Sequence, residues 1–206
     1  RERLRRRVIP RLVVWLSTIR RPVLARRGRV TLFVAFDDPQ SAVALLGLEQ
    51  RLAGRPVALE VLPVVQRGIP GDPAVDAKRR YAVLDARRLA RRDGLMLRRS
   101  APLAAADVAF LAEWAAAAPD TRFAVAAMRQ LWLESDGPVE REPYAALWRD
   151  LYGGEPPASG VTAERTFRRR KLYDTPVAVV RGEWFFAHER LPTIEQRLDE
   201  LGWRAA

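Results

Sequence analysis

A strand–helix–strand pattern near the start of the chain constrains its fold more than any other feature. Residues 29–36 are nearly all apolar and rich in β-branched and aromatic residues, which is typical of a buried central strand. Apolar residues at helical spacing follow from Ala42 to Leu52, and Gly54 ends that segment. A second strand is expected over residues 57–62. Because a helix joins the two strands, we expect them to pair in parallel as a β-α-β unit.

Helical patterns fill the middle of the chain. Residues 63–73 are rich in proline and glycine and are predicted to form a loop. Four helices are expected after it, over residues 76–93, 104–118, 123–135 and 143–152. A break of proline, glycine and serine follows at residues 155–160. The pattern therefore predicts a helical insertion over residues 64–159.

The last part of the chain returns to mixed structure. We expect a basic helix over residues 162–172, a strand over 175–181, a hairpin turn, a strand over 184–186 and a closing helix over 191–201. The whole order is β-α-β, four helices, then α-β-β-α. It predicts an α/β domain made of residues 30–63 and 160–206, with the helical insertion between them.

The positive charge is concentrated in an N-terminal arm, residues 1–29. The formal net charge of the 206-residue chain is +11, and the arm holds eleven arginines and one acid. The rest is nearly neutral, which argues against nucleic-acid binding by the whole protein. Three roles for the arm stay open: an anionic membrane surface, nucleic acid, or packing on the domain or a partner chain. Packing is favoured by the apolar residues Leu12, Trp15, Leu16 and Ile19.

The chain has no cysteine and one histidine. This excludes disulfides and a thiolate nucleophile, and it fits a reducing compartment, so we expect a cytoplasmic protein. No metal site is expected, because acids at ligand spacing are also lacking. There is no phosphate-binding glycine motif, no apolar run long enough to cross a membrane and no secretory signal pattern.

Three local motifs carry a resemblance to a known family. The first is Asp37-Asp38-Pro39-Gln40-Ser41 between the first strand and its helix. The second is the basic stretch over residues 80–94, and the third runs over residues 174–191, with Thr175-Pro176 before a strand and Glu189-Arg190-Leu191 after a hairpin.

On these motifs the chain resembles the DsbA-like branch of the thioredoxin-fold superfamily. Within that branch it is most similar to 2-hydroxychromene-2-carboxylate isomerases and kappa-class glutathione transferases. The resemblance covers about residues 30–203 and implies a thioredoxin-like α/β fold with a helical insertion. It also implies a cis peptide bond between Thr175 and Pro176.

The resemblance places Asp38 where the family has its reactive serine or cysteine. In the isomerases that serine contacts the sulfur of glutathione. An ionised Asp38 only accepts hydrogen bonds and would raise the pKa of a neighbouring thiol. Two routes to chemistry stay open: Ser41 donates to the thiolate, or Asp38 acts as a general base without it. The competing interpretation is that Asp38 is only a helix N-cap.

The other candidate site residues are implied to bind the substrate or glutathione. They are Pro39, Thr175, Pro176, His188, Glu189 and Arg190. For His188 we favour a surface residue after an edge strand over a proton shuttle. The basic run over residues 168–171 is interpreted as a solvated face. Trp114, Trp132 and Trp148 are expected in the core of the insertion, and some of them would line a substrate pocket if the family geometry holds.

Two functions follow as expectations. The first is an isomerase or glutathione transferase acting on a small aromatic substrate, with glutathione as cofactor and a homodimer as an open alternative to the monomer. The second is a degenerate thioredoxin-fold binding or scaffold protein. The resemblance does not extend to thiol–disulfide oxidoreductase activity, because the chain has no cysteine. Whether the chain is an enzyme stays open, since a fold alone does not settle function.

Overall fold

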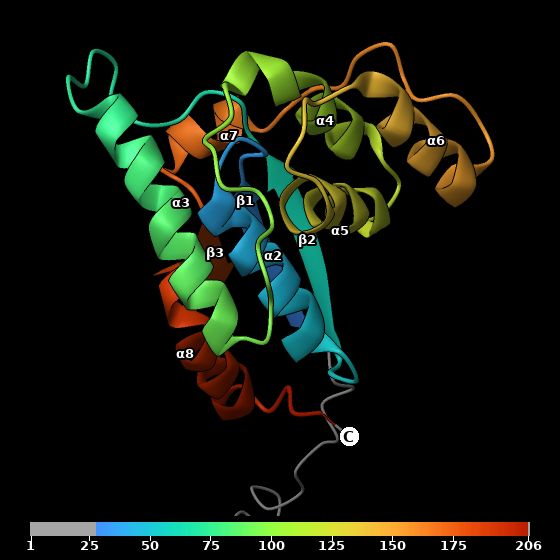
Figure 1. The fold of residues 1–206 in the computed structure, drawn as a ribbon. Helices are drawn as coiled ribbons and strands as arrows, with labels where there is room; N and C mark the ends of the chain where they lie inside the picture. Colours follow the sequence, from blue (N-terminus) through green and yellow to red (C-terminus); the bar gives the residue numbers. More distant parts are fainter. Residues whose placement is uncertain (1–27, 206) are drawn as a thin grey trace, which may run out of the picture.

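The computed structural model describes residues 28–205, so the hypotheses for the arm before Gly28 lie outside the described residues. A four-stranded sheet has the order β2-β1-β3-β4 (Figure 1). Its strands are β1 (Gly28–Val34), β2 (Val57–Pro63), β3 (Val177–Val180) and β4 (Glu183–Phe186). β1 and β2 pair in parallel, which confirms the expected β-α-β unit, and β3 pairs antiparallel with both β1 and β4.

The two faces of the sheet carry separate apolar cores, because alternate residues of a strand point to opposite faces. Val30, Leu32 and Val34 of β1 lie in the larger core, together with α2 (Pro39–Leu52) and α8 (Ala187–Glu200). Phe33 points to the other face, where its ring lies 5.6 Å from that of Phe167 in α7 (Glu164–Arg169). This is the layered arrangement that a thioredoxin-like domain requires.

The helical segment lies between β2 and α7 in the chain, as expected. It contains α3 (Val75–Arg92), α4 (Ala105–Ala117), α5 (Arg122–Arg129) and α6 (Arg141–Tyr152). α3 runs alongside α2 and α8, whereas α4, α5 and α6 gather on the other side of α2 (Figure 1). The helix predicted over residues 123–135 is present, but its last turn is a π-helix, Gln130–Glu134, closed by a bond from Ser135 N to Gln130 O over 3.0 Å.

The closing helix begins four residues before its expected start. α8 begins at Ala187, and Arg190 departs from helical geometry with φ −110° and ψ 17°. The cause is Pro192, which has no N–H to donate to the carbonyl of His188 four residues earlier. That carbonyl accepts from Arg92 Nη2 instead, over 3.3 Å. The helical pattern in the sequence therefore begins only after this kink, at residue 191.

The basic helix expected over residues 162–172 is shorter in the structure. α7 is limited to six residues, Glu164–Arg169. Lys171 has φ +56°, a left-handed conformation that cannot continue a right-handed helix. Within residues 28–205, no helix combines the length and the low polarity that crossing a membrane requires.

Candidate functional site

Asp38 lies between the end of β1 and the first turn of α2. Its Oδ1 accepts a hydrogen bond from the backbone N–H of Gln40 over 3.1 Å, and Pro39 occupies the first turn. Asp38 is therefore an N-cap, as the Asp-Pro pair indicated. The cap uses one carboxyl oxygen and leaves the other available for further partners.

Two hydroxyl groups donate hydrogen bonds to the second oxygen of Asp38. Ser41 Oγ donates to Oδ2 over 2.6 Å, and Thr175 Oγ1 donates to it over 3.0 Å. Ser41 Oγ in turn accepts from the backbone N–H of Ala35 over 3.2 Å. The peptide bond between Thr175 and Pro176 is cis, which confirms the expectation from the resemblance. The structure therefore brings together Asp38, Pro39, Ser41, Thr175 and Pro176.

Burial sets the electrostatics of Asp38. Its exposed fraction is 1%, and loss of water around the charged form raises the pKa of its carboxyl group above the ordinary value of 3.8. The positive charge of Arg67 and the bond from Ser41 oppose this increase, while the charges of Asp37 and Asp174 reinforce it. A carboxyl group with a raised pKa can exchange a proton nearer to neutral pH than an ordinary aspartate.

Arg67 is a member of the site that the sequence did not reveal. Its Nη2 lies 3.3 Å from Asp37 Oδ2, and its Nη1 lies 3.1 Å from Asp174 Oδ1. Burial alone would lower the pKa of Arg67, but the charges of Asp38, Asp37 and Asp174 outweigh it and raise that pKa. Because the residue lies in the proline- and glycine-rich loop after β2, the pattern gave it no role. The available signal was its position, since the carboxyl ends of two parallel strands meet at one edge.

A pocket of about 670 Å³ opens above Asp38. Asp38, Pro39 and Arg67 form part of its wall, and residues of α3 form another part. The wall also contains apolar and aromatic residues, namely Ile69, Val75, Tyr81, Pro102 and Tyr173. The pocket volume is in the range of pockets that take small organic molecules.

The three tryptophans of the helical segment do not line this pocket. Trp114, Trp132 and Trp148 are buried core residues, as the sequence indicated, so the conditional expectation of a tryptophan-lined pocket is wrong. Trp132 instead contacts the backbone of the segment that leads to Asp38. Its Nε1 donates to the backbone carbonyl of Phe36 over 3.0 Å, two residues before Asp38.

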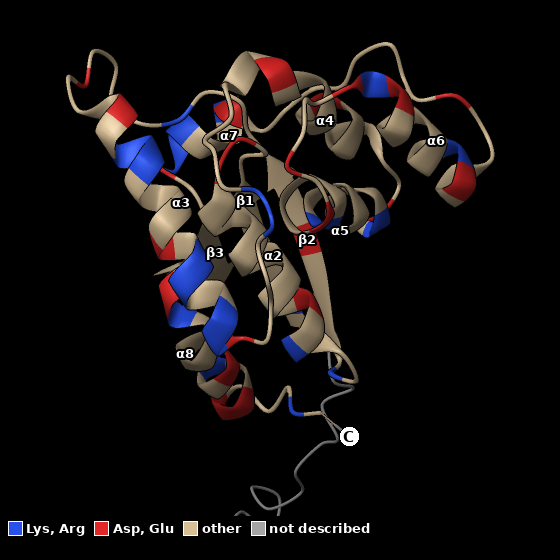
Figure 2. Ribbon diagram, viewed as in Figure 1, with Lys and Arg blue, Asp and Glu red and all other residues tan. Residues whose placement is uncertain are grey.

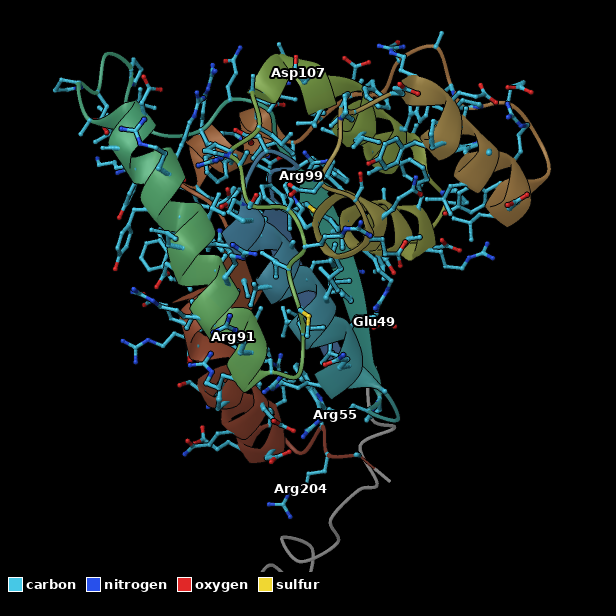
Figure 3. All side chains as sticks on the ribbon, in the orientation of Figure 1. Glu49, Arg55, Arg91, Arg99, Asp107 and Arg204 are labelled. Atoms are coloured by element: carbon cyan, nitrogen blue, oxygen red, sulfur yellow. The ribbon has the colours of Figure 1, made fainter. Side chains whose placement is uncertain are left out.

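A buried arginine fixes the π-helical turn that carries Trp132. Arg99 is 4% exposed, and its Nε donates to the carbonyl of Leu131 over 2.9 Å. Its Nη2 donates to the carbonyl of Gly137 over 2.8 Å. Figure 3 labels Arg99 beside this part of the helical segment. Arg99 therefore satisfies carbonyl groups at the irregular helix end that carries Trp132.

His188 is not the surface residue that we favoured from the sequence. It lies in the first turn of α8 with an exposed fraction of 7%, because α8 starts earlier than expected. Its Nδ1 has no hydrogen-bond partner within residues 28–205, and its Nε2 lies 3.9 Å from Glu189 Oε1. Burial lowers the pKa of His188, against the opposing charges of Asp38 and Glu189. The structure therefore favours a neutral imidazole.

The remaining predicted binding residues lie away from the pocket wall. Glu189 and Arg190 are exposed at the start of α8, and neither they nor His188 line the pocket above Asp38. In the part of the chain from 28 to 205, no three or more His, Cys, Asp or Glu residues cluster in a way that could hold a metal ion.

The fold is that of known DsbA-like proteins. A structure of 2-hydroxychromene-2-carboxylate isomerase is similar with a TM-score of 0.66 and 19% identity, covering 84% of this chain and 95% of the other. A probable DsbA oxidoreductase from Streptomyces coelicolor is similar with a TM-score of 0.57 and 16% identity, covering 87% and 92%. No protein-family profile matches the sequence, and no curated protein matches it significantly. The thioredoxin-like DsbA fold is therefore shown.

Proposed function

We propose that this chain is a small-molecule isomerase that moves a proton on an aromatic carboxylate, with Asp38 as the proton-transferring group. One observation carries the proposal. A carboxyl group that is 1% exposed forms part of the wall of a pocket of about 670 Å³ and is held in place by Gln40, Ser41 and Thr175. A fixed carboxyl group with a raised pKa is suited to general acid–base catalysis.

The pocket wall suggests the class of substrate. Tyr81 and Tyr173 are 59% and 58% exposed and offer aromatic surface. Arg79 also lines the pocket and has no ion-pair partner within residues 28–205. Arg67 is less suitable as an anchor, because Asp37 and Asp174 already neutralise it. We therefore assign a substrate carboxylate to Arg79 and an aromatic ring to the tyrosine side chains.

The substrate in the name of the similar isomerase structure is an aromatic compound with a carboxylate. A 2-hydroxychromene-2-carboxylate is an aromatic ring fused to a cyclic hemiketal that bears a carboxylate. Its isomerisation by ring opening breaks one C–O bond and moves one proton, with no change of oxidation state. The base takes the proton of the hemiketal hydroxyl, that oxygen forms a C=O double bond, the bond from the same carbon to the ring oxygen breaks, and the ring oxygen takes a proton to become a phenol. Asp38 would accept the first proton and return it, so no oxidant or metal is consumed.

The test is an absorbance assay with 2-hydroxychromene-2-carboxylate, in which ring opening changes the conjugation. We expect turnover by the unmodified chain and a loss of about 100-fold or more in kcat for Asp38→Asn. Asp72→Asn is the matched control, because Asp72 lines the same pocket but pairs with Lys78 at 2.5 Å and is not one of the hydrogen-bond partners of Asp38 within residues 28–205. Equal activity in Asp38→Asn and the unmodified chain would reject the role of Asp38.

Glutathione binding is a second proposal, favoured by the raised pKa of Asp38. A protonated Asp38 can donate a hydrogen bond to sulfur, which an ionised carboxylate cannot do. Affinity measured by calorimetric titration should then increase as the pH falls towards the pKa of Asp38. The Asp38→Ser variant should bind glutathione at higher pH as well. If neither chain binds glutathione or the aromatic carboxylate, the degenerate scaffold is the better hypothesis.

A further inference from the structure

One face of α3 carries four arginines around an exposed leucine. The spacing of Arg80, Leu84, Arg87, Arg88 and Arg91 places them on one side of the helix, with Tyr81 at its margin. Leu84 is 54% exposed and Tyr81 is 59% exposed. Val83, Ala86 and Ala90 form the buried side of the same helix. We call this outer surface of Arg80, Tyr81, Leu84, Arg87, Arg88 and Arg91 the α3 face.

The α3 face is strongly basic, and Asp136 is the acid whose pKa the charge of Arg87 helps to lower. Within residues 28–205, none of its four arginines has an ion-pair partner. Of the two acids in α3, Asp85 accepts a hydrogen bond from Gln40 of α2 over 2.8 Å and so is engaged on the inner side. Figure 2 shows the basic segments of α3, and Figure 3 labels Arg91 near its end. The face therefore suits an anionic partner.

Gly28, the first described residue, lies at the same end of the molecule as the last turn of α3. Gly28 N donates to the carbonyl of Pro56 over 2.7 Å, just beyond the end of α2. Arg51, in the last turn of α2, pairs at 2.6 Å with Asp93, the residue after α3. The sequence from 1 to 27 holds ten arginines and one acid. The sequence that precedes Gly28 is therefore strongly basic.

We propose that the α3 face docks on an anionic lipid surface. A basic surface that also exposes an apolar side chain is suited to the boundary between headgroups and acyl chains, with the apolar side chain turned to the lipid. Leu84 provides that side chain, and the arginines contact lipid phosphates, each worth about 1 kcal/mol near such a surface. A nucleic acid would use the arginines but not the exposed Leu84. The apolar residues of the preceding sequence, including Trp15 and Leu16, fit the same partner.

Sedimentation of the full 206-residue chain with vesicles tests the proposal. The probes are phosphatidylcholine vesicles with and without phosphatidylglycerol. We expect binding only to the vesicles with phosphatidylglycerol, and a partition at least about tenfold weaker for Arg88→Glu/Arg91→Glu. The matched control is Arg169→Glu/Arg170→Glu, an equal change of charge at exposed residues at the end of α7, which should keep most of the binding.

A second pair of variants tests the apolar contact at constant charge. Leu84→Ser should weaken the partition by about threefold or more, whereas Val161→Ser, at a residue that is 94% exposed elsewhere, should not. The proposal is overturned if the two arginine pairs weaken binding equally, if they both leave it unchanged, or if neutral vesicles bind as well. Preferential binding of a short DNA duplex over the anionic vesicles would also overturn it.

Discussion

The indole nitrogen of Trp132 donates a hydrogen bond to the backbone oxygen of Phe36 over 3.0 Å. This bond joins the helical segment to the turn that carries Asp38, and both side chains are at most 1% exposed. The helical segment therefore does more than cover the sheet, because one of its core residues fixes the backbone that positions the candidate catalytic group.

Trp132→Phe should lower the free energy of unfolding by about 1–3 kcal/mol, because the buried carbonyl of Phe36 loses its donor. Urea unfolding followed by circular dichroism measures this change. Trp184→Phe is the control, since Trp184 is 52% exposed and its loss should change stability by less than about 0.5 kcal/mol. Equal stability of Trp132→Phe and the unmodified chain would show that water or another group replaces the bond.

Asp38→Asn should change how stability depends on pH. Because burial raises the pKa of Asp38 in the folded chain, its protonated form favours folding. Its contribution is fully present below the unfolded pKa and is lost as the pH rises through the folded pKa. The variant should therefore gain stability relative to the unmodified chain over this range. Urea unfolding between about pH 4 and 8 measures the difference, and a constant difference would contradict the raised pKa.

His188→Gln should have its effect on the acid side. Burial lowers the pKa of His188 below its ordinary value of 6.5, so the neutral form favours folding. This contribution is present above the unfolded pKa and is lost as the pH falls through the folded pKa. The variant should therefore be less sensitive to acid than the unmodified chain. Thermal unfolding at a series of pH values below about 7 checks this, and parallel curves for the two chains would argue against it.

Gly160→Ala should destabilise the link between the helical segment and α7. A Cβ atom at residue 160 would overlap the backbone carbonyl of Glu113 in α4, and a backbone atom cannot move aside easily. We expect a loss of about 1–3 kcal/mol in the free energy of unfolding. Gly137→Ala is the matched control, because a Cβ there meets nothing within 4 Å. Similar stability of the two variants would mean that the two segments separate readily.

Local signals in the sequence predicted the order of helices and strands and the part of the site around Asp38. An aspartate before a proline indicated the N-cap at Asp38, and the position of Ser41 one turn later followed from helical spacing. The role of Arg67 could not be predicted in this way, because its partners Asp37 and Asp174 are joined only by the tertiary structure. The burial of His188 was missed for the same reason, since the kink at Arg190 hides the true start of α8.

The hydrogen bond from Thr175 to Asp38 joins residues that are 137 positions apart in the chain. Such a contact has a high sequence separation, so closing it costs more loop entropy than the local contacts of α2. During synthesis the cap at Asp38 can form as soon as α2 does, but its second hydroxyl partner is not made until the last sixth of the chain emerges. A chain truncated before Thr175 would thus keep Asp38 without its full set of hydrogen-bond donors. The environment of the Asp38 carboxyl group therefore depends on the C-terminal part of the chain.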